Sequence, residues 1–417
     1  MPGFEPFRGV RYVTGFGGHA TMGWSGPIDH DVVCAPPYDV IDEGERQALA
    51  RRHPRNAVRL ILPQDHHIEG DRYASAYDDY CLWHSEGTLD VDAAPRFYGY
   101  RMEFRDSLGH NRRTVGVIGA LELPAAPGEG DILPHERTMA KAKSDRLQLL
   151  RHTHLNVDPI WGLTLASGLT DLIEGAAGAS LGGCVDDNDN AHTLFAIDDA
   201  DAIAAIRGAI AGSPLVLADG HHRFETACAF RDQGPENANG ARPLGAPAIM
   251  TLVVELAEEQ LSIQAIHRLV TLTPGFEARA SLADAFSLSP VDSLAAAGDD
   301  ALVLVERGAL HVLEPRADVV ARELADEPDM LRAVDAAIVE RVVAPRWPDA
   351  TWTFRHDADE IVAQVHNGAY DAGLVLRPPT VATTRAAAAA RVRMPQKTTF
   401  FYPKPRTGLV FRDLEIG

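Results

Sequence analysis

The pentapeptide Asp219–Arg223, with the sequence Asp-Gly-His-His-Arg, constrains the fold of this chain more than any other segment. It lies between the apolar run Leu215–Ala218 and a helical pattern over Phe224–Arg231. This order predicts a strand, a tight turn at the glycine and the start of a helix. Because the first N–H groups of a helix lack partners within the helix and carry partial positive charge, we expect an anion site here, for a phosphate or a carboxylate.

The side chains of this pentapeptide allow three interpretations. In the first, Arg223 and backbone N–H groups hold phosphate oxygens, one histidine orients them, and Asp219 binds a metal ion or caps the helix. In the second, the imidazoles bind a metal, although adjacent histidines point apart and rarely share one ion. In the third, Asp219 is only a helix cap and the histidines make loop hydrogen bonds. We favour the first.

Length and composition indicate a globular protein of two or three domains. Hydrophobic residues make up 46% of the 417 residues and charged residues 24%, which is near the average for soluble proteins. No run of about 20 apolar residues could cross a bilayer, and the first residues lack the apolar core of a signal peptide. We therefore expect a cytoplasmic protein with no membrane partner.

Charge and cysteine content exclude further classes of protein. A formal net charge of −20 argues against nucleic acid as a partner, because nucleic-acid binding requires a basic face. The cysteines are widely spaced without a CxxC pair, which argues against a disulfide framework and a thiolate zinc site. Cys228 lies in an apolar helical face and is expected to be a buried structural thiol. The sequence does not determine the oligomeric state.

The pattern along the chain predicts an α+β (mixed α/β) fold with a division after residue 273. We expect a main α/β domain over 1–273 that carries the site, and a C-terminal α/β region over 274–417, richer in Ala and Asp, whose tail could return to the site. The elements expected in the first part are strands at 32–35 and 57–62, helices at 43–52 and 73–85, a hairpin of 97–105 with 114–123, and a strand at 248–255 whose sheet 264–270 could continue.

Titratable side chains follow a predicted loop at residues 124–130. They are His135, Glu136 and Arg137, with Lys141 and Lys143 on the helix expected next. A carboxylate among cations suits Mg²⁺ and phosphate handling. A zincin site is not supported, because residue 139 is Met and the HExxH pattern is absent. A solvated, charged helix face explains the same residues equally well.

Two prolines end the apolar run before Tyr38 and Asp39, which would place both side chains at a strand end. Strand ends are where sites of α/β proteins gather. Asp39 is therefore a candidate general base or metal ligand. A turn or helix cap explains it equally well.

The tail segment Met394–Pro405 interleaves Lys397 and Lys404 with aromatic residues and prolines. Such a strip could bind a nucleotide base and its phosphates. Alternatively, Phe400 and Tyr402 could be core residues of a closing strand, which is the more common reason for this spacing.

Several of these stretches together resemble one family. The chain looks like a member of the bacterial and archaeal family called domain of unknown function 1015, and the resemblance spans nearly the whole chain. The stretches that carry it are Pro36–Ile41, Ile132–Thr138, Asn156–Trp161, Ala218–Arg223 and Met394–Lys404.

A weaker resemblance concerns the pentapeptide alone, which is similar to the nucleotide-phosphate loop of the ParB/sulfiredoxin superfamily, including the free serine kinases. This resemblance implies a ParB/sulfiredoxin-like nucleotide-binding core with additional α/β regions. It also implies that Gly220, His222 and Arg223 contact phosphate and that an acidic residue, Asp39 or Glu136, is the base for a hydroxyl acceptor.

The leading hypothesis is a nucleotide-dependent phosphotransferase for a small hydroxyl-bearing metabolite, with free L-serine as the specific acceptor, ATP or ADP as the donor and Mg²⁺ as the cofactor. The rivals are a metal-dependent hydrolase with a His/Asp site and a non-catalytic nucleotide-binding regulatory protein. The expected catalytic residues are Asp39, His135, Glu136 and His222. The expected phosphate or nucleotide ligands are Asp219, Gly220, His221, His222, Arg223, Arg137, Lys141, Lys143, Lys397 and Lys404. The expected metal ligands are Asp219 and Glu136.

Overall fold

The computed structural model describes most of the chain, which folds into two compact units. The described residues are 2–13, 28–64, 71–106, 109–126, 129–134, 140–234, 242–298 and 300–417, with only the backbone described at 134 and 140–144. The first unit comprises Met1–Pro134, Thr138–Leu261 and Pro403–Gly417, and the second comprises His135–Arg137 and Ser262–Tyr402.

The first unit combines helices with a large sheet. Its strands are β1 (Phe4–Glu5), β2 (Val10–Tyr12), β3 (Leu89–Val91), β4 (Phe97–Arg105), β5 (Asn111–Glu122), β6 (Ile132–Pro134), β7 (Leu155–Asn156), β8 (Ile160–Thr164), β9 (Ser180–Val185), β10 (Ala191–Ile197), β11 (Leu215–Asp219), β12 (Ala248–Glu255) and β21 (Arg412–Asp413). Its α-helices are α1 (His30–Val33), α2 (Glu43–Arg52), α3 (Val58–Ile61), α4 (Arg72–Ser85), α5 (Ala140–Thr153), α6 (Leu169–Gly175), α7 (Ala200–Ala211) and α8 (His221–Asp232). Short 3₁₀ turns are η1 (Tyr38–Val40) and η2 (Glu258–Gln260).

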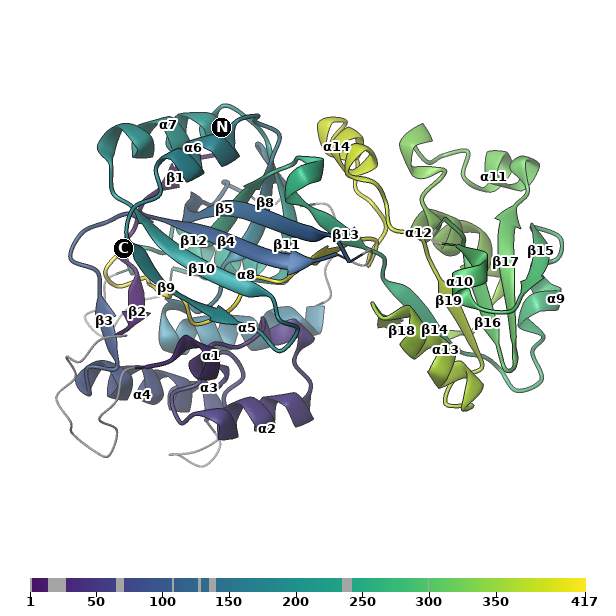
Figure 1. Cartoon of the computed structure of the whole chain (residues 1–417), viewed down its shortest axis with the longest axis horizontal. Coiled ribbons are helices and arrows are strands. Elements are labelled where there is room, and N and C mark those ends of the chain that lie inside the picture. Colours follow the sequence, from purple (N-terminus) through teal and green to yellow (C-terminus); the bar gives the residue numbers. More distant parts are fainter. Residues whose placement is uncertain are drawn as a thin grey trace. The chain divides into compact units, whose positions relative to one another are not determined.

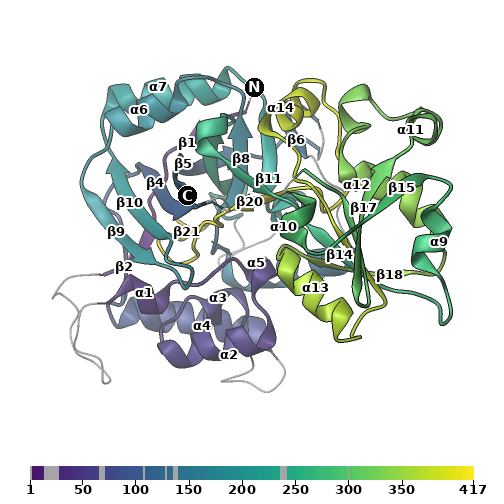
Figure 2. The ribbon, with the colours of Figure 1, turned by 45° about the vertical axis from the view of Figure 1, so that its right-hand side comes forward.

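The main sheet of the first unit has the strand order β6-β11-β8-β12-β5-β4-β10-β9, with β1 also paired to β5. The pairs β11–β6 and β12–β8 are parallel, and the other pairs in this sheet are antiparallel. Figures 1 and 2 show α6 and α7 on one side of this sheet and α1–α5 on the other. Strands β8 and β11 therefore lie inside the sheet, where their buried residues fix the position of the loops that follow them.

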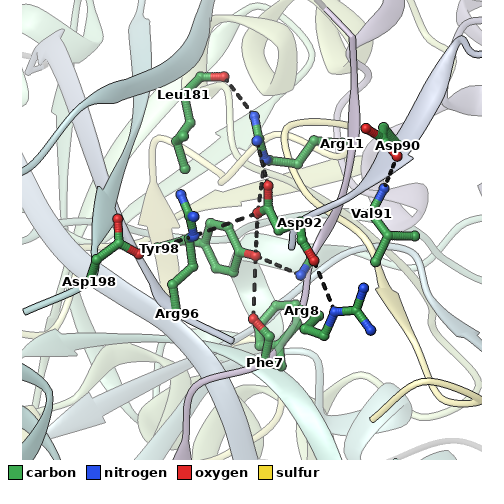
Figure 3. A network of polar contacts seen from close by, with 11 residues as sticks. Phe7, Arg8, Arg11, Asp90, Val91, Asp92, Arg96, Tyr98, Leu181 and Asp198 are labelled. Atoms are coloured by element: carbon green, nitrogen blue, oxygen red, sulfur yellow. Dashed lines mark hydrogen bonds and ion pairs between the residues drawn. The ribbon is translucent and has the colours of Figure 1, made fainter. Parts of the chain in front are cut away.

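A carboxylate fastens the small β2–β3 ribbon to this sheet (Figure 3). Asp92 accepts hydrogen bonds from Arg11 Nη2 at 2.6 Å and from the Tyr98 hydroxyl, on β4, at 2.7 Å. Burial alone would raise the pKa of Asp92, but the hydrogen bonds from these two side chains outweigh burial and lower it. The ribbon is thus held by an ionised, buried carboxylate.

The C-terminal segment Pro403–Gly417 is part of the first unit. Phe411 pairs with Val10 through two backbone hydrogen bonds of 2.9 Å, and its side chain is fully buried in a hydrophobic cluster with helices α1–α4. The buried Arg412 donates to the carbonyls of Ala248 and Gly245 at 2.9 and 3.1 Å. The end of the chain is therefore part of the core.

The second unit has its own sheet and core. Its strands are β13 (Ser262–Gln264), β14 (His267–Thr271), β15 (Phe286–Val291), β16 (Val303–Glu306), β17 (Ala309–Pro315), β18 (Thr351–Arg355), β19 (Ala372–Val375) and β20 (Phe400–Tyr402). Its helices are α9 (Ala278–Leu282), α10 (Leu294–Ala297), α11 (Ala317–Glu323), α12 (Asp335–Ile338), α13 (Ala358–His366) and α14 (Val381–Ala389), with the 3₁₀ turns η3 (Asp329–Leu331) and η5 (Ala344–Arg346) and the π-helical turn η4 (Val339–Val343). An antiparallel sheet has the order β15-β17-β16-β19-β14-β18, and β13 pairs with β20.

Several sequence expectations are confirmed. The fold is mixed α/β, the helices at 43–52 and 73–85 correspond to α2 and α4, and the hairpin corresponds to β4 and β5. Cys228 is buried on α8, and burial raises the pKa of its thiol to about 11. The predicted boundary after residue 273 stays a prediction, although β14, which precedes it, belongs to the second unit.

Other expectations are wrong. The expected strands at 32–35 and 57–62 are absent, and the short helices α1 (His30–Val33) and α3 (Val58–Ile61) overlap these ranges. Asn56 explains part of this difference, because its side-chain oxygen accepts from Val58 N at 2.9 Å while its amide donates to Val32 O at 2.8 Å. Strand β14 pairs with β18 and β19 and does not continue the sheet of β12. Among the described residues, no helix is both long enough and apolar enough to span a bilayer.

Replacing Phe411 by Ala is expected to destabilise the first unit by about 3–5 kcal/mol, because it opens a cavity in a closed core. Urea unfolding followed by circular dichroism measures this change. Leu244→Ala is the control, since Leu244 is 77% exposed and its loss is expected to change the unfolding free energy by less than about 0.5 kcal/mol. Equal effects of the two substitutions would contradict the place of the C-terminal segment in the core.

Candidate functional site

Strand β11, a glycine and helix α8 form the centre of the candidate site. Gly220 lies between them with φ +85° and ψ +26°, a left-handed conformation that favours glycine. A Cβ atom at this position would lie 2.6 Å from Cγ2 of Ile160 on β8. The predicted order of strand, glycine turn and helix is therefore confirmed, and close packing of the turn against β8 requires the glycine.

The carboxylate of Asp219, at the end of β11, is held between two cations. Lys404 Nζ donates to Oδ1, and Arg223 Nη2 donates to Oδ2 at 2.7 Å. The Asp219 and Lys404 side chains are each 12% exposed. Burial alone would raise the pKa of Asp219, but the charges of Lys404 and Arg223 outweigh burial and lower it to about 2. Asp219 is thus ionised at neutral pH.

Arg223 is a buried guanidinium that joins two loops. Its Nη1 donates to Asp158 Oδ2 at 2.5 Å and to the Pro159 carbonyl at 2.9 Å, while Nη2 donates to Asp219. Burial opposes the charged form, but the two carboxylates outweigh burial and raise the pKa of Arg223. The terminal nitrogens of Arg223, expected from the sequence to grip phosphate, are therefore engaged in ion pairs within the protein.

The Tyr38 ring lies against two guanidinium groups. The Cζ atom of Arg146, on α5, is 4.4 Å from the ring centroid, and that of Arg223 is 5.8 Å from it. Such cation–π contacts are stronger where water is excluded. Burial raises the pKa of Tyr38 to about 12, so the ring stays neutral at ordinary pH.

Asp39 is the exposed carboxylate of this region. Burial is the main cause that raises the pKa of Asp158, and the charge of Asp39 adds to it. Asp39 also adds to the effect of Asp158 and Asp219 on the pKa of Arg223, so it lies within electrostatic reach of the buried ion pair. It lies in the single turn η1, which follows helix α1, so the expectation that it ends a strand is wrong. Its role as a base stays a prediction.

The histidines of the pentapeptide open helix α8. His221 is buried and lies within electrostatic reach of Asp219, whereas His222 is half-buried. Gly220 has no side chain that could cap the first-turn N–H groups of α8. These N–H groups therefore donate to no capping side chain at this position.

For the remaining candidate residues, the structure does not show whether they belong to the site. His135, Glu136 and Arg137 lie outside the described residues, and for Lys141 and Lys143 the structure describes the backbone of α5 but not the side chains. Lys397 is exposed in the second unit, with φ +56°. The residues that the structure brings together in the first unit are Asp39, Asp219, Gly220, His221, His222, Arg223 and Lys404.

The part of the chain that the structure describes contains no preformed metal site. No group of three or more His, Cys, Asp or Glu residues there could hold a metal ion. Both oxygens of Asp219 accept hydrogen bonds from cations. A metal ion at Asp219 would therefore replace Lys404 or Arg223. Because His135 and Glu136 are outside the described residues, the predicted metal sites stay predictions.

Sequence reasoning assigned no role to three residues of this network. Tyr38 and Asp158 lie in the stretches that carried the family resemblance, and Arg146 is a buried residue of α5. The available signal for Asp158 was an acidic residue directly before a buried strand, a position where charge needs a partner. The sequence could not show that the partner is Arg223.

The comparisons with known proteins show the family. The model of the family described as "Protein of unknown function (DUF1015)" matches residues 4–337, and the chain belongs to this family. Among curated proteins, none matches the chain.

Solved structures resemble part of the chain at low sequence identity. A conserved hypothetical protein from Pyrococcus furiosus matches with 12% identity and a TM-score of 0.35, covering 68% of this chain and 93% of that one. A free serine kinase in complex with AMP matches with 12% identity and a TM-score of 0.34, covering 67% and 89%. SbnI from Staphylococcus aureus matches with 11% identity and a TM-score of 0.37, covering 67% and 82%. At these TM-scores the matches say nothing about substrate or mechanism.

Gly220→Ala is expected to destabilise the first unit by at least about 1–2 kcal/mol, because a left-handed conformation costs this much for a residue with a Cβ. The contact with Ile160 adds to the cost. Gly208→Ala on α7 is the matched control, since nothing lies within 4 Å of its Cβ position, and it is expected to stabilise by about 0.5–1 kcal/mol. Urea unfolding of both variants measures the difference, and a neutral Gly220→Ala would contradict the turn.

Lys404→Met is expected to destabilise the protein in a pH-dependent way. The folded pKa of Asp219, about 2, is below the unfolded value of about 3.9, so the pair stabilises above pH ~4 and this contribution is lost as pH falls toward 2. The deficit relative to the wild type is therefore largest near pH 6 and shrinks toward pH 3. Unfolding free energies across this range measure it.

Lys397→Met serves as the control for this series, because Lys397 is exposed and its side chain makes no ion pair within the described residues. Its unfolding free energy is expected to stay parallel to that of the wild type. A Lys404→Met deficit that does not change with pH would rule out the pairing with Asp219.

Proposed function

We propose that this member of the DUF1015 family is a nucleotide-dependent phosphotransferase for a small hydroxyl-bearing metabolite, with free L-serine as the acceptor and ATP or ADP as the donor. One observation carries the proposal. Four stretches that are far apart in the sequence meet in one charged network in the first unit: Tyr38–Asp39, Asp158, Asp219–Arg223 and Lys404.

The start of α8 is the proposed place for the nucleotide phosphates. The first-turn N–H groups of a helix attract phosphate oxygens, and Gly220 supplies no side chain that would cap them. His222 is half-buried at the same helix start and can donate to a phosphate oxygen. Lys404 supplies a positive charge from the tail. In this proposal Arg137, His221, Lys141, Lys143 and Lys397 remain candidate contacts.

Arg223 has a positioning role in the proposed mechanism. Its guanidinium is 9% exposed and is shared between Asp158 and Asp219, so it sets the distance between the two loops that carry them. The charge remains close to the site and can stabilise charge that develops during transfer. This assignment fits the buried geometry better than direct phosphate contact.

The proposed base is Asp39. Its carboxylate would accept the proton of the acceptor hydroxyl while the hydroxyl oxygen bonds to the terminal phosphorus of the nucleotide. The bond from that phosphorus to the bridging oxygen breaks, and its electron pair leaves with ADP, or with AMP when ADP is the donor. Exposure of Asp39 leaves it accessible to a small substrate. His135 and Glu136 remain alternative acid–base residues.

Mg²⁺ is the proposed companion of the nucleotide, because it neutralises charge on phosphate oxygens. Asp219 and Glu136 remain its proposed protein ligands. Asp219 fits this role chemically, since it is ionised without uptake or release of a proton. Binding there would require Lys404 to exchange its carboxylate partner for a phosphate oxygen.

Incubation of the full chain with L-serine, Mg²⁺ and ATP or ADP is expected to give O-phosphoserine, detected by mass spectrometry. Asp39→Asn is expected to lower kcat by about 100-fold or more, the usual contribution of a general base. Asp171→Asn is the matched control, because Asp171 is an exposed carboxylate of α6 outside the charged network. Its turnover is expected to equal that of the wild type.

Two outcomes would contradict this proposal. One is the absence of nucleotide-dependent product from serine and from other hydroxyl acceptors, in protein that unfolds cooperatively. The other is normal turnover in Asp39→Asn, which would remove Asp39 as the base. A thermal shift by ATP with Mg²⁺, but none by either Mg²⁺ or serine alone, is expected to accompany turnover, because a ligand that binds only the folded state stabilises it.

A further inference from the structure

The second unit contains a cavity of about 510 Å³, a volume typical of small-molecule sites. Its wall comes from β14, β18, the helical turns around Val339–Val343, and the segment after α14. The lining residues are Arg268, Glu327, Ala336, Val339, Glu340, Arg341, Ala344, Trp352, Phe354, Arg393, Met394, Pro395 and Gln396. All of them belong to the second unit.

One wall of this cavity is aromatic. Trp352 and Phe354 are two residues apart on β18, so both side chains lie on the same face of the sheet. The Trp352 ring stacks at 5.7 Å on Trp347, which is buried and donates to Ser281 Oγ at 2.9 Å. Phe354 is 39% exposed. The wall thus presents an aromatic surface that is supported from behind.

A buried arginine fixes this wall. Arg268 is directly opposite Phe354 in the β14–β18 register, and its Cζ lies 4.7 Å from the Phe354 ring centroid. Its terminal nitrogens donate to the carbonyls of Ile266 at 2.5 Å and Lys397 at 3.0 Å. The guanidinium therefore joins the aromatic strand to the segment that forms the next wall.

That next wall is the start of the Met394–Lys404 motif. Arg391 and Lys397, on either side of the lining residues, have φ of +55° and +56°, which is uncommon for residues other than glycine. The Thr398 hydroxyl donates to the Pro395 carbonyl at 2.6 Å and helps to hold this shape. Backbone conformations of this cost cluster at ligand-binding segments.

A third wall is a helix of unusual geometry. Residues Val339–Val343 form a π-helical turn, a rare conformation that is frequent at functional sites. Pro345 accounts for the widening, because its ring would clash with the carbonyl four residues earlier, that of Arg341. The wide turn brings Glu340 and Arg341 to the cavity.

The charges on the cavity favour an anion. Three arginines line it against two glutamates, and Arg341 is already paired with Glu327, its Nε being 2.8 Å from Oε1. Arg393 is exposed and makes no hydrogen bond or ion pair within the described part of the chain. A guanidinium on the wall of a cavity without an acidic partner is suited to a carboxylate or a phosphate.

From these walls we infer that the second unit holds a separate binding site for a small molecule that carries a planar ring and one anionic group. The ring stacks on Trp352 and Phe354, and the anionic group, a carboxylate or a phosphate, pairs with Arg393. The site does not depend on the phosphotransferase activity proposed for the first unit.

Isothermal titration calorimetry on the full chain tests this inference. The probes are AMP and indole-3-acetate, which carry a planar ring with a phosphate or a carboxylate, and the negative controls are adenosine and inorganic phosphate. At least one probe is expected to bind more tightly than both controls. Binding of only AMP would identify a nucleotide site, and binding of only indole-3-acetate a site for aromatic acids.

Arg393→Gln is expected to weaken binding of that probe about tenfold or more, because charged hydrogen bonds contribute this much to affinity. Arg316→Gln is the matched control, since Arg316 is also exposed in the second unit but does not line the cavity. Its affinity is expected to equal that of the wild type. Phe354→Leu is expected to weaken binding of the same probe, because its planar ring loses one of the two aromatic side chains on which it stacks.

The first unit supplies the test that separates the two sites. His222→Ala is expected to leave probe binding in the second unit unchanged, whatever its effect on turnover. The inference is overturned if neither probe binds, if Arg393→Gln binds as the wild type does, or if His222→Ala removes the heat of AMP binding. A failure of serine phosphorylation with these binding results intact would concern only the proposed function.

Discussion

The ion pairs of Arg223 are the interaction on which the first unit's candidate site depends. One buried guanidinium joins Asp158, in the turn before β8, to Asp219, at the end of β11. A buried charge that loses its partner costs roughly 3–5 kcal/mol. Removing either carboxylate would therefore leave part of the Arg223 charge without a partner. The pairs are better understood as fixing geometry than as adding stability, because desolvation offsets much of their attraction.

The tail completes this arrangement. Lys404 reaches Asp219 from the segment that ends in the core of the first unit, where Phe411 and Arg412 are buried. The second unit's sheet lies between β12 and this tail in the sequence, so both ends of the first unit must fold together before Asp219 has its second cation. Charge at the site thus depends on long-range contacts formed by the last residues.

The sequence predicts the local framework of the site because local rules determine it. The glycine between an apolar run and a helical period defines the turn at Gly220, and the regular helices α2 and α4 are predicted for the same reason. Prediction from short apolar runs is wrong here, because α1 and α3 have four residues each, too few to show a helical period. The ion-pair partners of Arg223 could not be predicted for another reason. The sequence shows which side chains carry charge, but not which charges meet across β7, β8 and β11.

This pairing changes what the site can offer an anion. In the sequence alone, Arg223 and Lys404 look like free cations awaiting phosphate, whereas in the structure Asp219 already neutralises both in part. In the proposed function, an incoming phosphate would either use the amides of α8 or take Lys404 from Asp219. The second route would leave Asp219 paired with Arg223 through one oxygen, and its other oxygen would be open to a divalent cation. Phosphate and metal binding would then be coupled through a single lysine that changes its partner.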